Sequence, residues 1–233
     1  MLELPVNIPD GKMYINPILL WDEDTAVLVD TGLPGQLELV REEIEKVGIA
    51  FDRLNMVIIT HQDMDHIGNL ASVQRMLEDV KVVSHMDERP YIEFEKIPLK
   101  LTPERLAKME AGLSGTPHKS AKEAFKARVD IAVKDGEEFN VCGGIEIIHT
   151  PGHTPGHQSL YLKKYKTLIS GDALNVVNGR LVGPNPQFTH NMETAMQSLK
   201  KLLKYDIQTV ICYHGGVFNE NIHQRLEELI SPK

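Results

Sequence analysis

Residues 60–69 read THQDMDHIGN and directly follow LNMVII at positions 54–59, a run in which five of the six residues are apolar. A continuous apolar run of this length, bounded by polar residues, predicts a strand that is buried on both faces. In α/β proteins the chemistry is commonly located at the carboxyl ends of such strands. The stretch therefore predicts an α/β fold with a reactive site at this strand end. Its candidate metal ligands or proton-transfer groups are His61, Asp63, Asp65 and His66.

The composition of the whole chain is that of an ordinary globular protein. With 233 residues, of which 42% are hydrophobic and 25% charged, we expect one domain spanning 1–233. No apolar run approaches the roughly 20 residues of a membrane span, and the N-terminus lacks a signal-peptide pattern, so we expect a cytoplasmic protein without membrane contact. A formal net charge of −8 argues against a nucleic-acid partner. Cys142 and Cys212 lie in apolar surroundings and are expected to be buried thiols. The sequence leaves open a homodimer.

Strand-like runs alternate along the chain with amphipathic helical patterns, which predicts an α/β arrangement. Leu37, Val40, Ile44 and Val47 fall at helical spacing, and Asn191 is placed to begin another helix. We predict helices at 36–47, at 68–78 and after 191, and strands at 25–29, 54–59, 81–83, 145–148, 159–162, 167–170 and 209–213.

Residues 86–135 differ from the rest of the chain because they are charged and interrupted by four prolines. Thr102, Pro103 and Glu104 form the pattern of a helix N-terminus, with a capping residue, a proline and an acidic first turn. We interpret this range as a helical insertion or lid on the main domain. Arg89 and Tyr91, at its beginning, are candidates to contact a substrate.

Potential metal ligands occur at four predicted strand ends. The decapeptide follows the strand at 54–59, His153 follows the strand at 145–148, Asp172 follows TLIS, and His214 follows TVICY. A catalytic transition-metal ion takes three or four nitrogen and oxygen donors, so seven donors fit two ions. Two metals can hold a hydroxide between them, which is the usual way to make a nucleophile from water at neutral pH.

The set of motifs resembles the metallo-β-lactamase superfamily. The decapeptide, TPGHTPGH at 150–157, SGD at 170–172 and YHGG at 213–216 occur in the order of that superfamily, and LVDTG at 28–32 resembles its first motif. The resemblance implies an αβ/βα four-layer sandwich with a dinuclear site. It also implies the roles of individual residues: His61, Asp63 and His153 on one metal; Asp65, His66 and His214 on the other; Asp172 between them; and Asp30, Thr60 and His157 as supporting residues without metal contact.

Asp63 departs from the superfamily pattern, His-x-His-x-Asp-His, because it replaces the second histidine. A carboxylate can still bind zinc, but it lowers the net charge of the two-metal site from +2 to +1 and favours harder ions. We therefore expect two divalent ions, with zinc as the first choice and iron or manganese admitted by Asp63. The flavodiiron proteins of the same superfamily also carry a carboxylate here, but they use Glu and an added flavodoxin domain.

The predicted function is that of a dinuclear metal-dependent hydrolase in which a metal-bound hydroxide attacks a small ester, lactone or thioester. Asp65 and Asp172 are its predicted catalytic carboxylates. Asp172 distinguishes the chain from true β-lactamases, and the short segment after His214 argues against a glutathione thioester. The chain resembles lactonases in size, although Asn175 stands where several of them carry a substrate-binding Tyr. Three alternatives remain: a diiron oxidoreductase of the same fold, a phosphoester hydrolase, and a metal-stabilised binding module without turnover.

Overall fold

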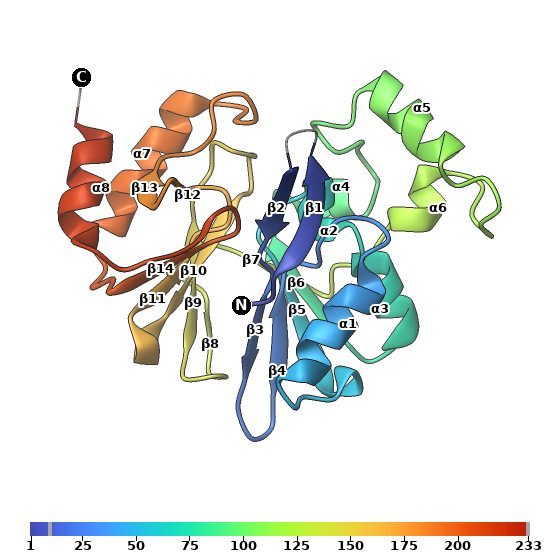
Figure 1. Cartoon of the computed structure of the whole chain (residues 1–233), viewed down its shortest axis with the longest axis horizontal. Coiled ribbons are helices and arrows are strands. Elements are labelled where there is room, and N and C mark those ends of the chain that lie inside the picture. The colour runs from blue at the N-terminus through green and yellow to red at the C-terminus, as the bar shows by residue number, and fades with distance from the viewer. Residues whose placement is uncertain (9–10, 232–233) are drawn as a thin grey trace.

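Two β-sheets packed face to face, with helices on both outer sides, make up the protein (Figure 1). The computed structural model describes residues 1–8 and 11–231. The first sheet has the order β3-β4-β5-β6-β7 and the second the order β15-β14-β11-β10-β9-β8. The strands of the first sheet are β3 (Ile18–Trp21), β4 (Ala26–Val29), β5 (Leu54–Ile59), β6 (Lys81–His85) and β7 (Ile131–Val133). Those of the second are β8 (Glu138–Phe139), β9 (Ile145–His149), β10 (Gln158–Leu162), β11 (Thr167–Ile169), β14 (Thr209–Cys212) and β15 (Gly216–Phe218).

The central strands of the first sheet are buried on both faces, as the apolar run at 54–59 predicts. Alternate residues of β4 and β5 face opposite layers: Val29 and Ile58 pack against the second sheet, whereas Leu28 and Val57 pack against the outer helices. The second sheet is covered on its other side by a separate apolar cluster. The predicted αβ/βα four-layer sandwich is therefore confirmed.

The outer helices supply one apolar face each to the two sheets. The first sheet is covered by α1 (Leu37–Lys46) and α3 (Leu70–Met76), and the second by α7 (Met192–Leu202) and α8 (Ile222–Ile230). Two capping predictions are confirmed. The Oγ1 atom of Thr102 accepts a hydrogen bond from Arg105 N at 3.3 Å, and the Oδ1 atom of Asn191 accepts one from Thr194 N at 2.9 Å.

The range 86–135 contains three short helices, of which the second and third project from the first half of the molecule (Figure 1). They are α4 (Arg89–Ile92), α5 (Pro103–Ala111) and α6 (Ala121–Phe125). Phe94, Leu101 and Ala121 form a small apolar cluster of their own. The range also contains β7, which pairs with β6, so the helical insertion ends before residue 131.

Two hairpins that the sequence patterns did not predict lie near the ends of the sheets that carry the candidate ligands. They are β1 (Leu4–Ile8) with β2 (Gly11–Ile15), and β12 (Asn175–Val177) with β13 (Arg180–Val182). A bridge between Ile15 and His214 joins the first hairpin to the turn after β14. The N–H of Val176 donates to His214 O at 3.0 Å and joins the second hairpin to the same turn.

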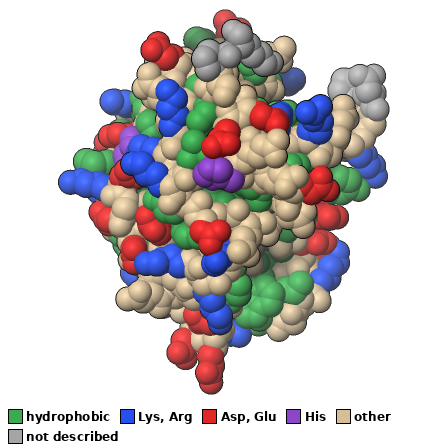
Figure 2. Space-filling model, turned by 90° about the vertical axis from the view of Figure 1, so that its left-hand side faces the viewer, with side chains coloured by type: hydrophobic (Ala, Val, Ile, Leu, Met, Phe, Trp, Pro, Cys, Tyr) green, Lys and Arg blue, Asp and Glu red, His purple; other side chains and the backbone are tan. Residues whose placement is uncertain are grey.

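The charged surface and the buried cysteines are as expected from the amino-acid composition. Figure 2 shows acidic and basic side chains interspersed over the face that carries the C-terminal helices. Both cysteines are buried and free. None of the helices in the described ranges is long and apolar enough to cross a membrane.

The turn after β14 requires glycine at position 215, and this requirement can be tested. Gly215 has φ +92°, and a Cβ atom there would lie 2.0 Å from Val176 O, whereas Gly35 has φ +86° with open space around its Cα. We expect Gly215→Ala to lower the free energy of unfolding by at least about 3 kcal/mol, because strain and a backbone clash add. Gly35→Ala should cost only about 1 kcal/mol of strain. Urea unfolding of both variants measures the difference, and equal losses would contradict the packing described for this turn.

Candidate metal centre

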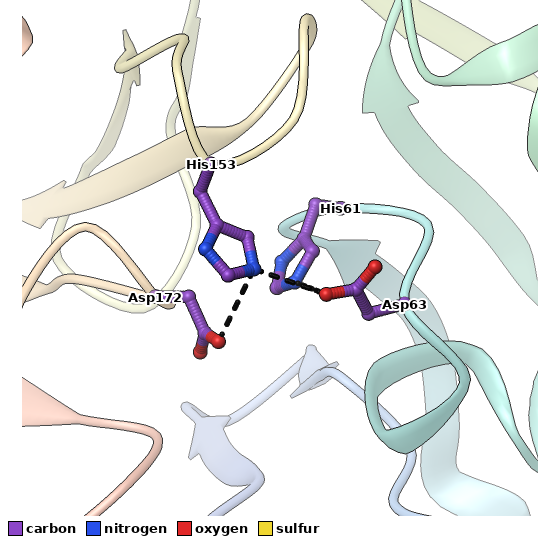
Figure 3. A group of neighbouring side chains, drawn as sticks. All are labelled: His61, Asp63, His153 and Asp172. Atoms are coloured by element: carbon purple, nitrogen blue, oxygen red, sulfur yellow. Dashed lines mark hydrogen bonds and ion pairs between the residues drawn. The ribbon is translucent and has the colours of Figure 1, made fainter. Parts of the chain in front are cut away.

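Seven side chains from four loops converge where the two sheets meet. Figure 3 shows two residues of the loop after β5 facing one residue from the loop after β9 and one from the loop after β11. The fourth loop, after β14, contributes His214 from the same end of the second sheet. The seven residues are His61, Asp63, Asp65, His66, His153, Asp172 and His214.

A first group forms around the carboxylate of Asp63. Its Oδ2 atom lies 3.1 Å from His61 Nε2 and 3.0 Å from His153 Nε2. The carboxylate lies at the N-terminus of α2 (Met64–Ile67) but makes no capping hydrogen bond to that helix. It therefore points into the centre together with the two imidazoles.

A second group is formed by Asp65, His66 and His214. The Oδ2 atom of Asp65 lies 3.7 Å from His66 Nε2 and 3.3 Å from His214 Nε2. Asp172 lies between the groups: its Oδ1 atom is 3.3 Å from His66 Nε2, and its Oδ2 atom is 3.3 Å from the Nε2 atom of His153. The two oxygens of one carboxylate thus face the two groups.

Outer hydrogen bonds orient three of the histidines. The hydroxyl of Thr60 donates to Asp30 and can accept from His61 Nδ1 at 3.0 Å, and the Oδ2 atom of Asp30 accepts from His66 Nδ1 at 2.8 Å. The Nδ1 atom of His153 lies 3.4 Å from the hydroxyl oxygen of Thr189. That hydroxyl donates a hydrogen bond to the backbone carbonyl of Asn185. These bonds place a proton on Nδ1 of each ring, so the Nε2 atoms point into the centre.

Acceptor atoms therefore face one another. Burial and the neighbouring His66 lower the pKa of His61 to about 4, so its Nε2 atom holds a lone pair against the Asp63 carboxylate at neutral pH. Buried acceptors without a donor are costly, and a cation between them removes the cost. Four buried polar atoms of the centre lack a hydrogen-bond partner within the described chain: Asp63 Oδ1, His66 Nε2, Asp172 Oδ1 and His214 Nδ1. The residues present fit divalent metal ions.

The second group carries a strong negative field. Burial alone would lower the pKa of His214, but Asp172 and Asp65 outweigh it and raise that pKa to about 9. Burial also acts to lower the pKa of His66, but nearby carboxylates, of which Asp30 has the largest effect, hold that pKa well above its usual value. These carboxylates favour a positive charge at this position.

The residues expected to support the centre do so without pointing into it. The backbone N–H of Asp172 donates to His157 Nε2 at 3.0 Å, which fixes the loop after β11. The Oδ1 atom of Asp30 accepts from Thr60 N at 2.8 Å and joins the ends of β4 and β5. Gly68 is required because a Cβ atom there would lie 2.3 Å from Pro34 N.

Glu88 is a supporting residue that the sequence patterns did not predict. It is fully buried, and its Oε1 atom accepts from Thr154 Oγ1 and Gly156 N, both at 2.7 Å. Its Oε2 atom accepts from Gln62 N at 2.8 Å. One carboxylate thus joins the loop that carries His61 to the loop that carries His153. Its charged neighbours in the sequence gave it the pattern of a solvent-exposed helix start.

Lys100, in the insertion, was also not predicted. Its Nζ atom contacts the Oδ2 atom of Asp63 and lies 2.7 Å from His153 Nε2. It is the cation that neutralises part of the first group.

The predicted substrate-contact residues have different positions. Asn175 is buried and lines a cavity of about 1060 Å³ together with Asp172 and His214. Tyr91 lies in α4 with the Lys96 ammonium over its ring, 5.6 Å from the centroid. It does not line this cavity or a second one of about 550 Å³ beside Asp63 and Asp65, as far as the described residues define them.

One histidine outside the metal centre and its supporting residues, His85, is buried. The ring of His85 stacks on His149 with centroids 3.9 Å apart. Burial and the His149 ring lower the pKa of His85 to about 4, so it is neutral at physiological pH. His223, in contrast, is exposed on α8.

The four-layer fold and the cluster of seven imidazole and carboxylate side chains are together typical of a class of metallohydrolases. Comparison with known proteins gives the same class. The chain belongs to the metallo-β-lactamase superfamily, whose family model matches residues 10–214. A probable metallo-hydrolase, YflN, of Bacillus subtilis is 30% identical over 218 residues, covering 87% of this chain and 80% of that protein. A metallo-beta-lactamase family protein of Thermus thermophilus superposes with a TM-score of 0.69 at 25% identity, covering 98% of this chain and 77% of the other. The chain is thus a hydrolase of this superfamily.

One relative changes an expectation drawn from chain length. The hydroxyacylglutathione hydrolase GloC of Haemophilus influenzae is 28% identical over 230 residues, which is 97% of both chains. A protein of that name therefore matches this chain almost from end to end. The short segment after His214 does not by itself argue against a glutathione thioester.

The role of Glu88 in holding the two ligand-bearing loops together can be tested by mutation. Glu88→Ala leaves three buried donors without an acceptor, so we expect the free energy of unfolding to fall by about 3 kcal/mol or more. Glu95→Ala, at an exposed position in the same segment, is the control and should change it by less than about 0.5 kcal/mol. Chemical unfolding of the metal-free proteins gives both values. A Glu88→Ala protein as stable as its control would refute this role.

Proposed function

We propose that this protein is a dinuclear metallohydrolase that cleaves a small ester, lactone or thioester with water. The observation that carries the proposal is the position of Asp172, whose two oxygens face two separate groups of imidazole and carboxylate donors at 3.3 Å. A single bridging carboxylate between two donor groups is suited to two adjacent metal ions.

The donor groups suggest which residues would hold each ion. His61, Asp63 and His153 would hold one, and Asp65, His66 and His214 would hold the other, with Asp172 shared. The donors are imidazole nitrogen and carboxylate oxygen, which suit zinc, iron and manganese. Zinc is the first choice, and the oxygen donor of Asp63 admits iron or manganese.

When bound, two divalent ions supply Lewis acidity that polarises the scissile bond and lowers the pKa of water. The protein contributes position and proton acceptors. Asp172 and Asp65 present carboxylate oxygens toward the space where water would be activated, and His214 faces both of them at 3.5 and 3.3 Å. Outer hydrogen bonds from Asp30 and Thr60 keep the rings from rotating as charge develops.

The cavity beside the second group supports a substrate with an apolar portion. It has a volume of about 1060 Å³, slightly above the upper end of the usual range for small-molecule sites. Asn175 lies in its wall together with Asp172 and His214, and its side-chain amide is the candidate donor to a substrate carbonyl. Its apolar lining includes Met13, Tyr14, Val176, Val182 and Phe188. A thioester is included among the candidates because the relative GloC is named for one.

A diiron oxidoreductase is the second candidate, and Asp63 is the observation that favours it. A third carboxylate facing the ions stabilises higher positive charge, as iron acquires on oxidation. Iron bound stoichiometrically, with an absorption that changes on reduction, would favour this candidate. A colourless protein that turns over esters or lactones would dismiss it.

The proposed hydrolase predicts that metal and activity are lost together. His153→Ala and Asp172→Ala should each bind less than two ions per chain and lower hydrolysis by about 1,000-fold or more, because each removes a donor from the bridged site. His223→Ala, which changes an exposed histidine of α8, is the control and should keep both properties.

The measurement combines elemental analysis of protein purified without added metal with a panel of ester, lactone, thioester and phosphodiester substrates. Turnover of a phosphodiester alone would replace the proposed substrate class with a phosphoester. If protein shown to be free of metal kept full activity on any of these substrates, the metallohydrolase proposal would fail.

A further inference from the structure

The insertion places one lysine inside the candidate metal centre. The Nζ atom of Lys100 contacts Asp63 Oδ2 and lies 2.7 Å from His153 Nε2, and its side chain is 23% exposed. Both partner atoms belong to the first donor group, and His153 Nε2 carries the lone pair that a metal ion would use. The ammonium therefore occupies the place where positive charge is needed.

The position of Lys100 is fixed by the chain on either side of it. Leu99 N donates to the Oε1 atom of Gln62 at 2.7 Å, so the insertion is bonded to the residue between His61 and Asp63. The guanidinium of Arg105 donates to Lys100 O at 3.1 Å, and Leu101 is buried in the apolar cluster of the insertion. These contacts hold the backbone around Lys100 in place, so its ammonium is positioned in the site more firmly than that of an ordinary surface lysine.

The charge of Lys100 offsets the carboxylate of Asp63, which stands where the superfamily pattern has histidine. With Asp63, Asp65 and Asp172, the centre carries one more negative charge than a centre with histidine at position 63 would carry. One ammonium in contact with Asp63 restores the balance. Lys100 also lines two cavities, of about 550 and 320 Å³, so the ammonium has space to move away from His153.

We propose that Lys100 is the internal counter-ion of Asp63: it occupies the first metal position in the metal-free protein and must leave His153 when a metal ion binds there. Because this role rests on the proposed function, in which His61, Asp63 and His153 hold one ion, its test must measure metal binding separately from hydrolysis. The insertion then regulates the occupancy of the first metal position.

The role predicts opposite effects of one substitution on the two forms of the protein. In Lys100→Met, the metal-free protein should melt at a lower temperature than wild type, because Asp63 and His153 then face each other without a donor. The same variant should bind the first Zn²⁺ at least about tenfold more tightly, because neither competition nor repulsion by the ammonium remains. The rise in melting temperature on adding Zn²⁺ should therefore exceed that of wild type.

Zinc affinity is measured by competition with a chromophoric chelator, and melting temperature by circular dichroism with and without Zn²⁺. Lys108→Met, at an exposed position of α5, is the matched control and should match wild type in both. Lys100→Gln keeps a neutral donor toward Asp63, so it should fold even if the methionine variant does not, and it should also bind Zn²⁺ more tightly.

The double variant Asp63→His/Lys100→Met tests the pairing itself. If Lys100 neutralises Asp63, removing the lysine should increase zinc affinity more in the Asp63→His background than in the wild-type background. In the Asp63→His protein the ammonium has no carboxylate partner, so its repulsion of the metal ion is not offset. Zinc affinity of Lys100→Met and Lys100→Gln that is equal to or weaker than that of Lys108→Met would overturn the role. If the Lys100 variants bind zinc more tightly but the wild-type protein hydrolyses none of the substrates, the counter-ion role is supported and the proposed hydrolase function is rejected. Failure of one proposal can therefore be distinguished from failure of the other.

Discussion

The geometry of the centre depends on the buried carboxylate of Asp30, which points at none of the proposed metal positions. It lies at the end of β4 with φ +61°, a left-handed conformation that aspartate tolerates better than most residues. From there it accepts hydrogen bonds at 2.8 Å from the N–H and the hydroxyl of Thr60 and from the ring of His66. Because the same hydroxyl orients His61, one carboxylate sets the direction of a histidine in each donor group. The strained backbone at Asp30 is thus compensated by the bonds that aim the ligands.

A second carboxylate extends this arrangement to the other sheet. Glu88 holds the loop after β5 and the loop after β9 through three hydrogen bonds, and Gln62 connects it to the insertion through the N–H of Leu99. The insertion is therefore bonded into the decapeptide, at a residue between two candidate ligands. This continuity explains how a segment with its own small apolar cluster can hold Lys100 at a defined position.

Local patterns predicted the α/β arrangement and the seven candidate ligands because those features depend on neighbouring residues. The four-layer sandwich was implied by the resemblance of the ordered motifs to the superfamily. The apolar run at 54–59 became β5 with the same bounds, and Thr102 and Asn191 became helix caps. Glu88 and Lys100 could not be predicted, because their partners Gln62 and Asp63 lie 26 and 37 residues away in the chain. Each is a charged residue in a charged segment, a pattern that indicates solvent exposure. The two hairpins were missed because their strands are short and mix apolar with polar residues, and they are stabilised by the turns they pack against.

Asp63 shows how much of this site is arranged around positive charge. An aspartate that precedes a helix usually caps it and contributes about 1 kcal/mol to its stability. Asp63 precedes α2 but makes no such bond, and its buried Oδ1 atom has no hydrogen-bond partner among the residues that the structure describes. Its Oδ2 atom instead faces two imidazole nitrogens and an ammonium. A capping hydrogen bond to α2 would require a different orientation of this side chain. The orientation is explained by a cation in the centre, and Lys100 supplies one in the metal-free protein. The charges at positions 63 and 100 therefore contribute directly to the electrostatics of this centre.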